Sequence, residues 1–304
     1  MKKFVLIVCG WLMIASLQAR VLRVNNYDGS APYSKVQNAV DAAAEGDTIM
    51  LDGSPYSYGD VTLDKRVVLV GNGYYLVTND VVTESIPDAI VGNITVNVEG
   101  CVIKSLNISG DVTQGKIRIN APKVIINRCY LSNSDFSIVM GEGADNCIIS
   151  QSRICGPIGN SYVMTYNHQI TNNMLNNMNV RGIHNSYVAY NTSLSAWGDV
   201  VYWSTGNKIE RNHVYNENFG VGDNDNAYVD NYTTGDLFRN ASSVLEIKNM
   251  SLPDDAKGKG CFAGSDPFVI SGVPTGPMIE ELDVPTSAEA GGTMTVSVKI
   301  GESR

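Results

Sequence analysis

A repeat of about twenty residues constrains the fold of this chain more than any other sequence feature. Five segments align so that each has Leu, Ile or Tyr six positions after its first residue: Ile125–Leu131, Ile148–Ile154, Gln169–Leu175, Val188–Leu194 and Ile209–Tyr215. Their middle positions hold Arg128, Gln151, Asn172, Asn191 and Asn212, and Asn231 continues the series. Successive middle positions lie between 19 residues (172 to 191) and 23 residues (128 to 151) apart. This period is too short for a two-helix repeat, and the units hold too few leucines for a leucine-rich repeat.

The same period suits one coil of a parallel β-helix. Such a coil consists of short strands joined at sharp corners, and equivalent residues stack about 4.8 Å apart along the axis. Asparagine suits a corner because it tolerates left-handed backbone geometry, and stacked Asn side chains can hydrogen-bond along a ladder. We therefore predict an all-β solenoid with a structural ladder formed by Asn172, Asn191, Asn212 and Asn231.

The N-terminus has the pattern of a secretory signal peptide. Lys2 and Lys3 precede an apolar run from Phe4 to Leu17, and Ala19 supplies a small residue at the expected cleavage site. The run is shorter than the roughly 20 apolar residues of a transmembrane helix. We predict that residues 1–19 are a signal peptide and that the protein is exported to the periplasm, the cell surface or the medium. No later segment is predicted to span a membrane.

One helix is predicted, at about residues 34–44. Ser34 and Gln37 match a capping box, and Val36, Ala39 and Val40 lie on one apolar face. The ends of a stack of coils expose unpaired strand edges, which natural proteins cover. We therefore expect this helix to cap the N-terminal end of a β-helix that spans residues 20–240.

The stretch from Tyr33 to Ala43, followed by Gly46-Asp47-Thr48-Ile49, resembles the entry of secreted bacterial right-handed β-helix proteins of the pectin-lyase-like superfamily. The Asn-bearing coils also resemble the repeats of that superfamily. The resemblance covers about residues 20–240 and implies a right-handed parallel β-helix. Its motifs identify a fold rather than an activity.

The composition and pattern of the sequence change near residue 240. Residues 241–304 include a Gly- and Lys-rich stretch at 254–260 and an alternating strand pattern at 293–300. We predict that this region is a C-terminal cap or tail, because the second end of the stack also needs cover. The alternative is a docking or attachment segment that contacts a protein partner.

Charge and cysteine content narrow the possible partners. The formal net charge of -9 disfavours nucleic acid, whose phosphates require a basic surface. Five cysteines follow the predicted signal peptide, and they are Cys101, Cys129, Cys147, Cys155 and Cys261. Their odd number and the lack of a CxxC spacing favour buried, unpaired thiols over disulfides or a metal site.

Stacking of the coils predicts a candidate site. The position twelve residues after each corner holds His184, Trp203 and Asn224 on successive coils, so these residues are expected in one column. Residues close to this column in sequence are Arg181, Asp199, Tyr202, Asp223 and Asp225. Neighbouring residues of a strand point to opposite faces, so only one of Tyr202 and Trp203 is expected outside.

An aromatic surface with planar hydrogen-bonding groups is suited to sugar rings. We therefore assign Tyr202, Trp203, His184 and Asn224 as candidate polysaccharide-binding residues. The alternative is that the two aromatic side chains pack beneath a loop, since single apolar surface residues are common. His168 and His213 are expected to be structural.

Catalytic alternatives use the same region. Asp199 with Asp223 or Asp225 could serve an inverting glycosidase, which needs two carboxylates roughly 6.5–9.5 Å apart. Arg181 or His184 could act as the base of a polysaccharide lyase. Asp223 and Asp225 could hold calcium, but the segment lacks the Gly and distal Glu of an EF-hand loop, so no metal or cofactor is predicted.

The resemblance does not extend to catalytic motifs. The sequence has no match to the paired-Asp, His and Arg-x-Lys signatures of pectin-degrading hydrolases, or to the Arg-bearing strand of pectate lyases. The favoured hypothesis is an exported protein that recognises polysaccharide without cleaving it. A divergent polysaccharide lyase or glycosidase and a purely structural surface protein remain as alternatives.

Overall fold

The computed structural model describes residues 19–76, 87–110, 116–132, 135–176, 179–194, 201–215, 225–238, 241, 243–274, 277–283 and 297–302. The predicted signal peptide falls almost wholly outside these ranges and stays a prediction. No helix in the described ranges is long and apolar enough to cross a membrane.

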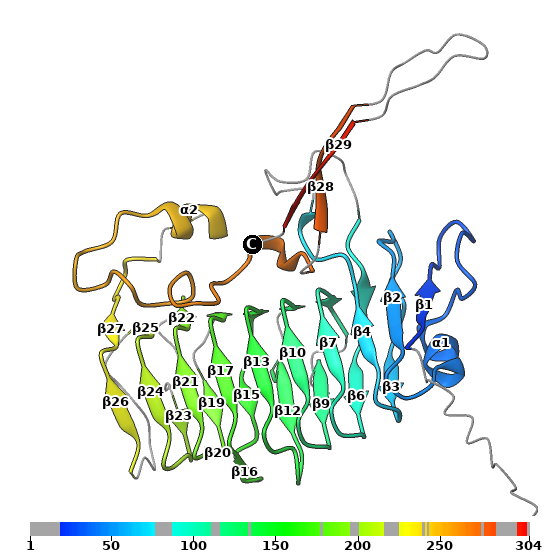
Figure 1. Cartoon of the computed structure of the whole chain (residues 1–304). Helices are drawn as coiled ribbons and strands as arrows, with labels where there is room; N and C mark the ends of the chain where they lie inside the picture. Colours follow the sequence, from blue (N-terminus) through cyan, green and yellow to red (C-terminus); the bar gives the residue numbers. More distant parts are fainter. Residues whose placement is uncertain are drawn as a thin grey trace, which may run out of the picture.

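The chain folds as a right-handed parallel β-helix built from three parallel sheets, as the repeat predicted (Figure 1). Sheet A has ten strands: β1 (Val21–Val24), β2 (Thr48–Leu51), β4 (Val68–Val70), β7 (Val102–Lys104), β10 (Ile125–Asn127), β13 (Ile148–Ser150), β17 (Gln169–Thr171), β21 (Tyr187–Ala189), β24 (Lys208–Glu210) and β26 (Ala227–Val229). Sheet B has seven strands: β3 (Val61–Leu63), β6 (Ile94–Val96), β9 (Ile117–Ile119), β12 (Ile138–Met140), β15 (Ile158–Gly159), β19 (Val180–Arg181) and β23 (Val201–Tyr202).

Sheet C has eight strands: β5 (Ile90–Val91), β8 (Asn107–Ile108), β11 (Tyr130–Leu131), β14 (Arg153–Ile154), β18 (Met174–Leu175), β22 (Thr192–Ser193), β25 (His213–Val214) and β27 (Tyr232–Thr233). A short parallel pair, β16 (Thr165–Tyr166) and β20 (Ile183–His184), lies between sheets B and A in the chain. The chain passes through each coil in the order B, A, C. The last two strands, β28 (Pro277–Asp283) and β29 (Ser297–Glu302), form an antiparallel hairpin outside the solenoid.

Aliphatic side chains fill the interior because equivalent residues stack in register. In sheet A, Ile103, Ile126, Ile149 and Ile170 occupy paired positions on successive strands, and all four are fully buried. Side chains alternate between the two faces of a strand, so the flanking residues point outward. This alternation fixes which residues form the outer surface of each sheet.

Sheet A is bounded on both sides by corners with left-handed backbone. The corner from sheet A to sheet C is formed by Ser105, Arg128, Gln151, Asn172, Tyr190, Arg211 and Asp230, all at φ between 50° and 57°. The corner before sheet A is formed by Gly46, Gly100, Lys123, Asn146, Asn167, Asn185, Gly206 and Asp225, all with positive φ. One such residue at an edge turns the chain sharply between strands of only two to four residues.

A ladder of amides runs inside the corner between sheets A and C. Its members are Asn173, Asn191, Asn212 and Asn231, and each of the first three donates from Nδ2 to Oδ1 of the next at 3.0 Å. The same Oδ1 atoms accept the backbone N–H of the preceding coil, at 2.8–3.0 Å. Each Nδ2 also donates to a carbonyl of the previous coil, as Asn191 does to Ile170 at 2.8 Å. The ladder thereby satisfies buried backbone groups that the corner leaves without strand partners.

The prediction that Asn172 belongs to this ladder is wrong by one residue. Strand pairing aligns Gln169 with Tyr187, whereas the sequence alignment paired Gln169 with Val188. Asn173 is therefore the inward residue, and Asn172 occupies the left-handed corner with its side chain outside. The alignment failed here because the coil from 173 to 191 is one residue shorter than assumed.

A second polar column lies inside the corner before sheet A. His168 Nδ1 accepts the backbone N–H of Cys147 at 3.2 Å, and the His168 N–H donates to Ser186 Oγ at 2.9 Å. Ser186 N–H donates to Asn207 Oδ1 at 2.8 Å, and Asn207 N–H donates to Asn226 Oδ1 at 2.8 Å. Each of these four coils therefore presents a side-chain acceptor to the backbone of the coil before it, as in the first ladder.

Helix α1 (Val36–Ala42) covers the end of the stack beside β1, β2 and β3 (Figure 1). The predicted capping box is absent, because Lys35 is the N-cap residue and no side chain caps the helix. Gln37 instead pairs with the first strand of sheet B. Its Oε1 accepts the N–H of Thr62 at 2.9 Å, and its Nε2 donates to the carbonyl of Thr62 at 3.2 Å. This contact satisfies backbone groups at an exposed strand edge.

Residues 243–274, which include α2 (Val244–Asn249) and a 3₁₀ turn (Ile270–Gly272), run back along the side of the solenoid over sheet C. The outward corner residues hold this segment through hydrogen bonds to its backbone. Arg128 Nη1 donates to the carbonyl of Val273 at 2.8 Å, and Asn172 Nδ2 donates to that of Ala263 at 2.7 Å. A second apolar cluster packs beneath it, formed by Tyr74, Met174, Phe238, Ile247, Cys261 and Phe268.

The five cysteines beyond the predicted signal peptide are all buried and unpaired. Burial raises the pKa of Cys129 and Cys261 to about 12 and that of Cys147 to about 11. These thiols therefore remain protonated near neutral pH and act as packing groups.

The amide ladder should be a major source of stability. Asn191→Ala leaves the buried N–H of Asn173 and the carbonyl of Ile170 without their partners, so we expect a loss of about 3 kcal/mol in the free energy of unfolding. Urea unfolding measures this. Asn146→Ala is the control, because Asn146 is an exposed corner residue outside the ladder, and it should cost about 1 kcal/mol. Equal losses for the two variants would contradict the role of the ladder.

His168 should make the fold sensitive to acid. Burial lowers its pKa to about 4, against about 6.5 in an unfolded chain. Between these values the unfolded state binds a proton that the folded state excludes, so stability falls as the pH drops from 6.5 to 4. The loss from this residue is about 3 kcal/mol. His168→Asn retains a side-chain acceptor and should reduce the acid-dependent loss in urea unfolding. Identical pH profiles for the two proteins would refute this assignment.

Candidate functional site

The outer face of sheet B carries the candidate site. Strand pairing stacks its outward residues in one column: Thr62, Thr95, Arg118, Val139, Gly159, Arg181 and Tyr202. The inward neighbours of these residues, such as Ile119, Val180 and Val201, are buried in the core. Three coil spacings of about 4.8 Å place the backbones of Arg118 and Arg181 roughly 14 Å apart.

A depression of about 350 Å³ lies between the two arginines. Its lining includes Arg118, Phe136, Val139, Gly159, Tyr162 and Arg181. Gly159 is required at the floor because its backbone is left-handed, with φ of 97°, and an added Cβ would collide with the carbonyl oxygen of Arg181. The absent side chain leaves the surface hollow at this coil.

Two aromatic rings hold the guanidinium of Arg181. Its Cζ lies 5.9 Å from the centre of the Phe136 ring and 5.8 Å from that of Tyr202. Its Nε donates to Asn179 Oδ1 at 2.6 Å. Stacking on aromatic faces attracts the cation and limits its motion, so this planar donor is arranged before any ligand binds.

Trp203 extends the aromatic surface beyond the strand. Its side chain is 53% exposed, and its ring meets Tyr202 edge to face, with centres 5.6 Å apart. The expectation that Tyr202 and Trp203 could not both face outward is wrong, because β23 ends at Tyr202 and Trp203 lies in a corner. The backbone of Trp203 is left-handed, with φ of 52°, where Gly182 stands in the preceding coil. Such a conformation strains a bulky residue.

His184 does not share a column with Trp203. It pairs with Tyr166 and Thr205 on the short sheet that follows sheet B. Its side chain is only 7% exposed, and its Nδ1 lies 2.8 Å from Thr205 Oγ1. Burial lowers the pKa of His184 below its ordinary value.

The column prediction failed because the loops between sheets C and B vary in length. Arg181 follows its corner residue Asn172 by nine positions (172 to 181). Tyr202 follows its corner residue Tyr190 by twelve (190 to 202). A constant offset of twelve therefore cannot select one column.

Two of the acidic candidates, Asp199 and Asp223, lie outside the described ranges, as does the candidate sugar-binding residue Asn224. Asp225 is an exposed corner residue two positions before β26. Among the residues that the structure describes, no three His, Cys, Asp or Glu side chains come close enough to hold a metal ion.

Sequence reasoning missed Arg118, Phe136 and Tyr162. The alternation in Ile117-Arg118-Ile119 does place the arginine outside, but only the strand register shows that it shares a column with Arg181. Tyr162 is 97% exposed in a loop and carries no periodic signal. Together these residues provide cationic planar donors beside aromatic rings, a combination that recognises carboxylates and sugar rings.

The three sheets and their left-handed corners define the protein as a right-handed parallel β-helix. Among solved structures, it is similar to the pectin methylesterase PemA from Erwinia chrysanthemi. The two chains are 11% identical and superpose with a TM-score of 0.40, covering 77% of this chain and 98% of the esterase. No protein-family model and no curated protein sequence matches the chain.

The strained corner at Trp203 predicts an unusual order of stabilities. Glycine adopts positive φ without steric cost, so Trp203→Gly should be more stable than Trp203→Ala by about 1 kcal/mol in urea unfolding. Thr95, on the outer face of β6, provides the control. There the glycine variant should be less stable than the alanine variant by about 0.5–1 kcal/mol. The same order at both positions would contradict the left-handed geometry of Trp203.

Proposed function

We propose that this protein binds an acidic polysaccharide along the outer face of sheet B and does not cleave it. The observation that carries the proposal is the Arg181 guanidinium held between Phe136 and Tyr202 at one end of a depression that Arg118 borders at the other. Planar guanidinium groups bind carboxylates through paired hydrogen bonds. The exposed rings of Tyr162 and Trp203 provide surfaces for the C–H faces of sugars.

The geometry of the column suits a polymer. The coil spacing of about 4.8 Å is close to the length of one pyranose unit in an extended chain, so successive coils can contact successive sugars. Two arginines three coils apart can then hold carboxylates on separate residues of one chain. Local cationic groups offset the negative charge of the protein as a whole.

The described lining of the depression favours binding over cleavage. It contains neither a carboxylate nor an imidazole, whereas glycosidases use a pair of carboxylates. Asp199 and Asp223 lie outside the described ranges, so a divergent lyase or glycosidase remains the second candidate. The predicted signal peptide would deliver the protein to the cell surface or the medium, where such polymers occur.

Binding should depend on Arg181. We expect the protein to bind oligogalacturonate or oligoalginate, and Arg181→Ala should weaken this binding about tenfold to a hundredfold, as for loss of a charged hydrogen-bonding partner. Isothermal titration calorimetry at low and at physiological salt measures the affinity, which should fall as salt screens the charges. Arg66→Ala is the matched control, because Arg66 is an exposed arginine in the coil of β3 and β4.

The same oligosaccharides should be scored for products. Unsaturated products, detected by ultraviolet absorbance, or new reducing ends would replace the binding proposal with the enzymatic one. Failure of every acidic glycan to bind, with equal behaviour of wild type and Arg181→Ala, would favour a structural surface protein.

A further inference from the structure

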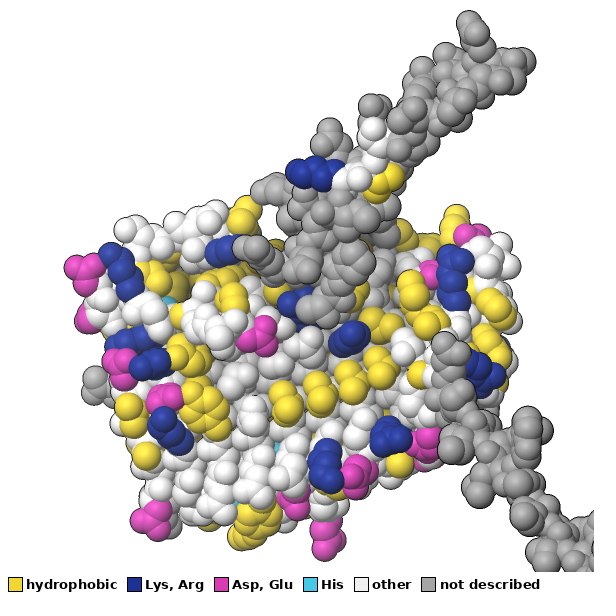
Figure 2. Space-filling model, viewed as in Figure 1, with side chains coloured by type: hydrophobic (Ala, Val, Ile, Leu, Met, Phe, Trp, Pro, Cys, Tyr) yellow, Lys and Arg dark blue, Asp and Glu magenta, His cyan; other side chains and the backbone are white. Residues whose placement is uncertain are grey.

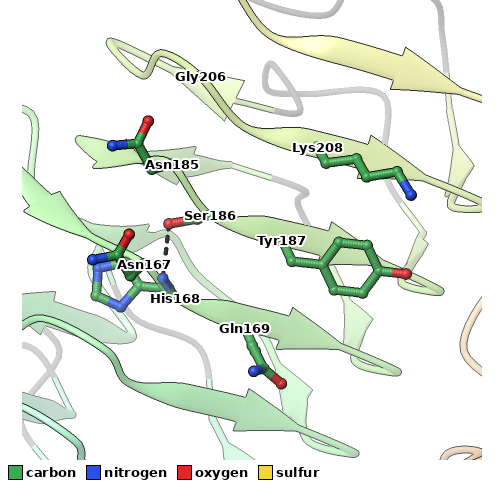
Figure 3. Close-up of a pocket in the computed structure, with 8 residues that line it drawn as sticks. All are labelled: Asn167, His168, Gln169, Asn185, Ser186, Tyr187, Gly206 and Lys208. Atoms are coloured by element: carbon green, nitrogen blue, oxygen red, sulfur yellow. Dashed lines mark hydrogen bonds between the residues drawn. The ribbon is translucent and has the colours of Figure 1, made fainter.

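A second depression, of about 360 Å³, lies on a different face of the solenoid (Figure 3). It spans the corner before sheet A and the first residues of β17, β21 and β24. Asn167, Asn185 and Gly206 border it on the corner side, and Gln169, Tyr187 and Lys208 border it on the strand side. None of these residues lines the depression on sheet B.

Three carboxamides in this depression have no partner within the described part of the chain. The exposed side chains of Asn167, Gln169 and Asn185 make no hydrogen bond to any described residue. Inside the same coils, the amides of Asn173 and Asn191 are fully engaged in the ladder. The outer amides are therefore available both as donors and as acceptors to a ligand.

Left-handed geometry accounts for the asparagines but not for Gln169. Asn167 and Asn185 occupy corner positions that favour Asn for conformational reasons. Gln169 lies in a strand, where it follows the outward apolar row formed by Val68, Val102, Ile125 and Ile148. Figure 2 shows an apolar row along this face that gives way to polar side chains on its left. The outward position therefore changes from Ile148 to Gln169 at the coil that carries Asn167.

The aromatic and charged groups beside the amides are already ordered. Tyr187 donates its hydroxyl to Glu210 Oε1 at 2.5 Å, and Lys208 Nζ lies 5.7 Å from the centre of the Tyr187 ring. Lys208 is also paired with Glu210 at 2.6 Å. This pairing neutralises the lysine, so the depression offers amides and an aromatic ring without a net charge.

Gly206 keeps the Asn185 amide accessible. It occupies the corner position that Asn146, Asn167 and Asn185 occupy in earlier coils. A Cβ at residue 206 would lie 2.5 Å from Asn185 Oδ1. The missing side chain therefore leaves space next to this acceptor.

We propose that this depression is a second glycan-binding site, which takes a neutral sugar residue through the carboxamides of Asn167, Gln169 and Asn185. Hydroxyl groups both donate and accept, which matches amides better than carboxylates or phosphates do. The volume suits one or two sugar units. This site is independent of the depression on sheet B, because it lies on another face and selects a ligand without charge.

The test uses neutral hexasaccharides of glucose, mannose, galactose and xylose, followed by saturation-transfer NMR and isothermal titration calorimetry. At least one of them should bind with millimolar or better affinity. Gly206→Asn keeps a residue that tolerates the left-handed corner but fills the depression, and it should weaken binding about tenfold or more. Asn185→Gly should weaken it similarly without straining the backbone.

Two control variants separate this site from the fold and from the first site. Asn146→Gly changes the equivalent corner of an earlier coil and should bind like the wild type. Arg181→Ala should leave neutral-sugar binding unchanged, and oligogalacturonate should not compete for it. The proposal is overturned if no neutral hexasaccharide binds, if Gly206→Asn and Asn185→Gly bind normally, or if oligogalacturonate displaces the neutral ligand.

Discussion

The structure depends on how each coil satisfies the backbone at its corners. A strand of three residues contributes few hydrogen bonds, and a one-residue left-handed corner leaves the adjacent N–H inside the solenoid without a strand partner. The side chain of the next coil supplies the missing acceptor, through Asn191 and Asn212 in one ladder and through Ser186 and Asn207 in the other. Because a buried unpaired N–H is costly, these ladders fix the axial register of the coils that they join.

The alignment of the outward residues follows from the alignment of the buried ladders inside the solenoid. Once the ladders align the coils, outward residues separated by about twenty positions in sequence become neighbours about 4.8 Å apart. Arg181 then contacts Tyr202 from the next coil, and Lys208 contacts Tyr187 from the previous one. The outward corner residues have a further role, since Arg128 and Asn172 hold the C-terminal segment against the side of the solenoid. The solenoid thus displays a separate set of side chains on each of its faces.

The sequence predicts the type of fold well because the fold repeats. Hydrophobic alternation recurs along the whole stack and a corner Asn recurs in its later coils, so an error in one coil does not hide the period. The repeat does not, however, assign each residue to the correct position within its coil. Both Asn172 and Asn173 fit a corner, and only strand pairing shows that Asn173 points inward. Loop lengths between sheets C and B also vary without a sequence signal, which separated His184 from Trp203 and hid the alignment of Arg118 with Arg181.

Strand register places two arginines and their aromatic neighbours beside one depression on sheet B, which we propose binds an acidic polysaccharide. A crystal structure of the protein with bound oligogalacturonate tests it most directly. We expect sugar density along β9, β12, β15 and β19, with one carboxylate on the guanidinium of Arg181 and another towards Arg118. Density confined to another face, or a sugar chain on sheet B whose carboxylates avoid both arginines, would contradict it.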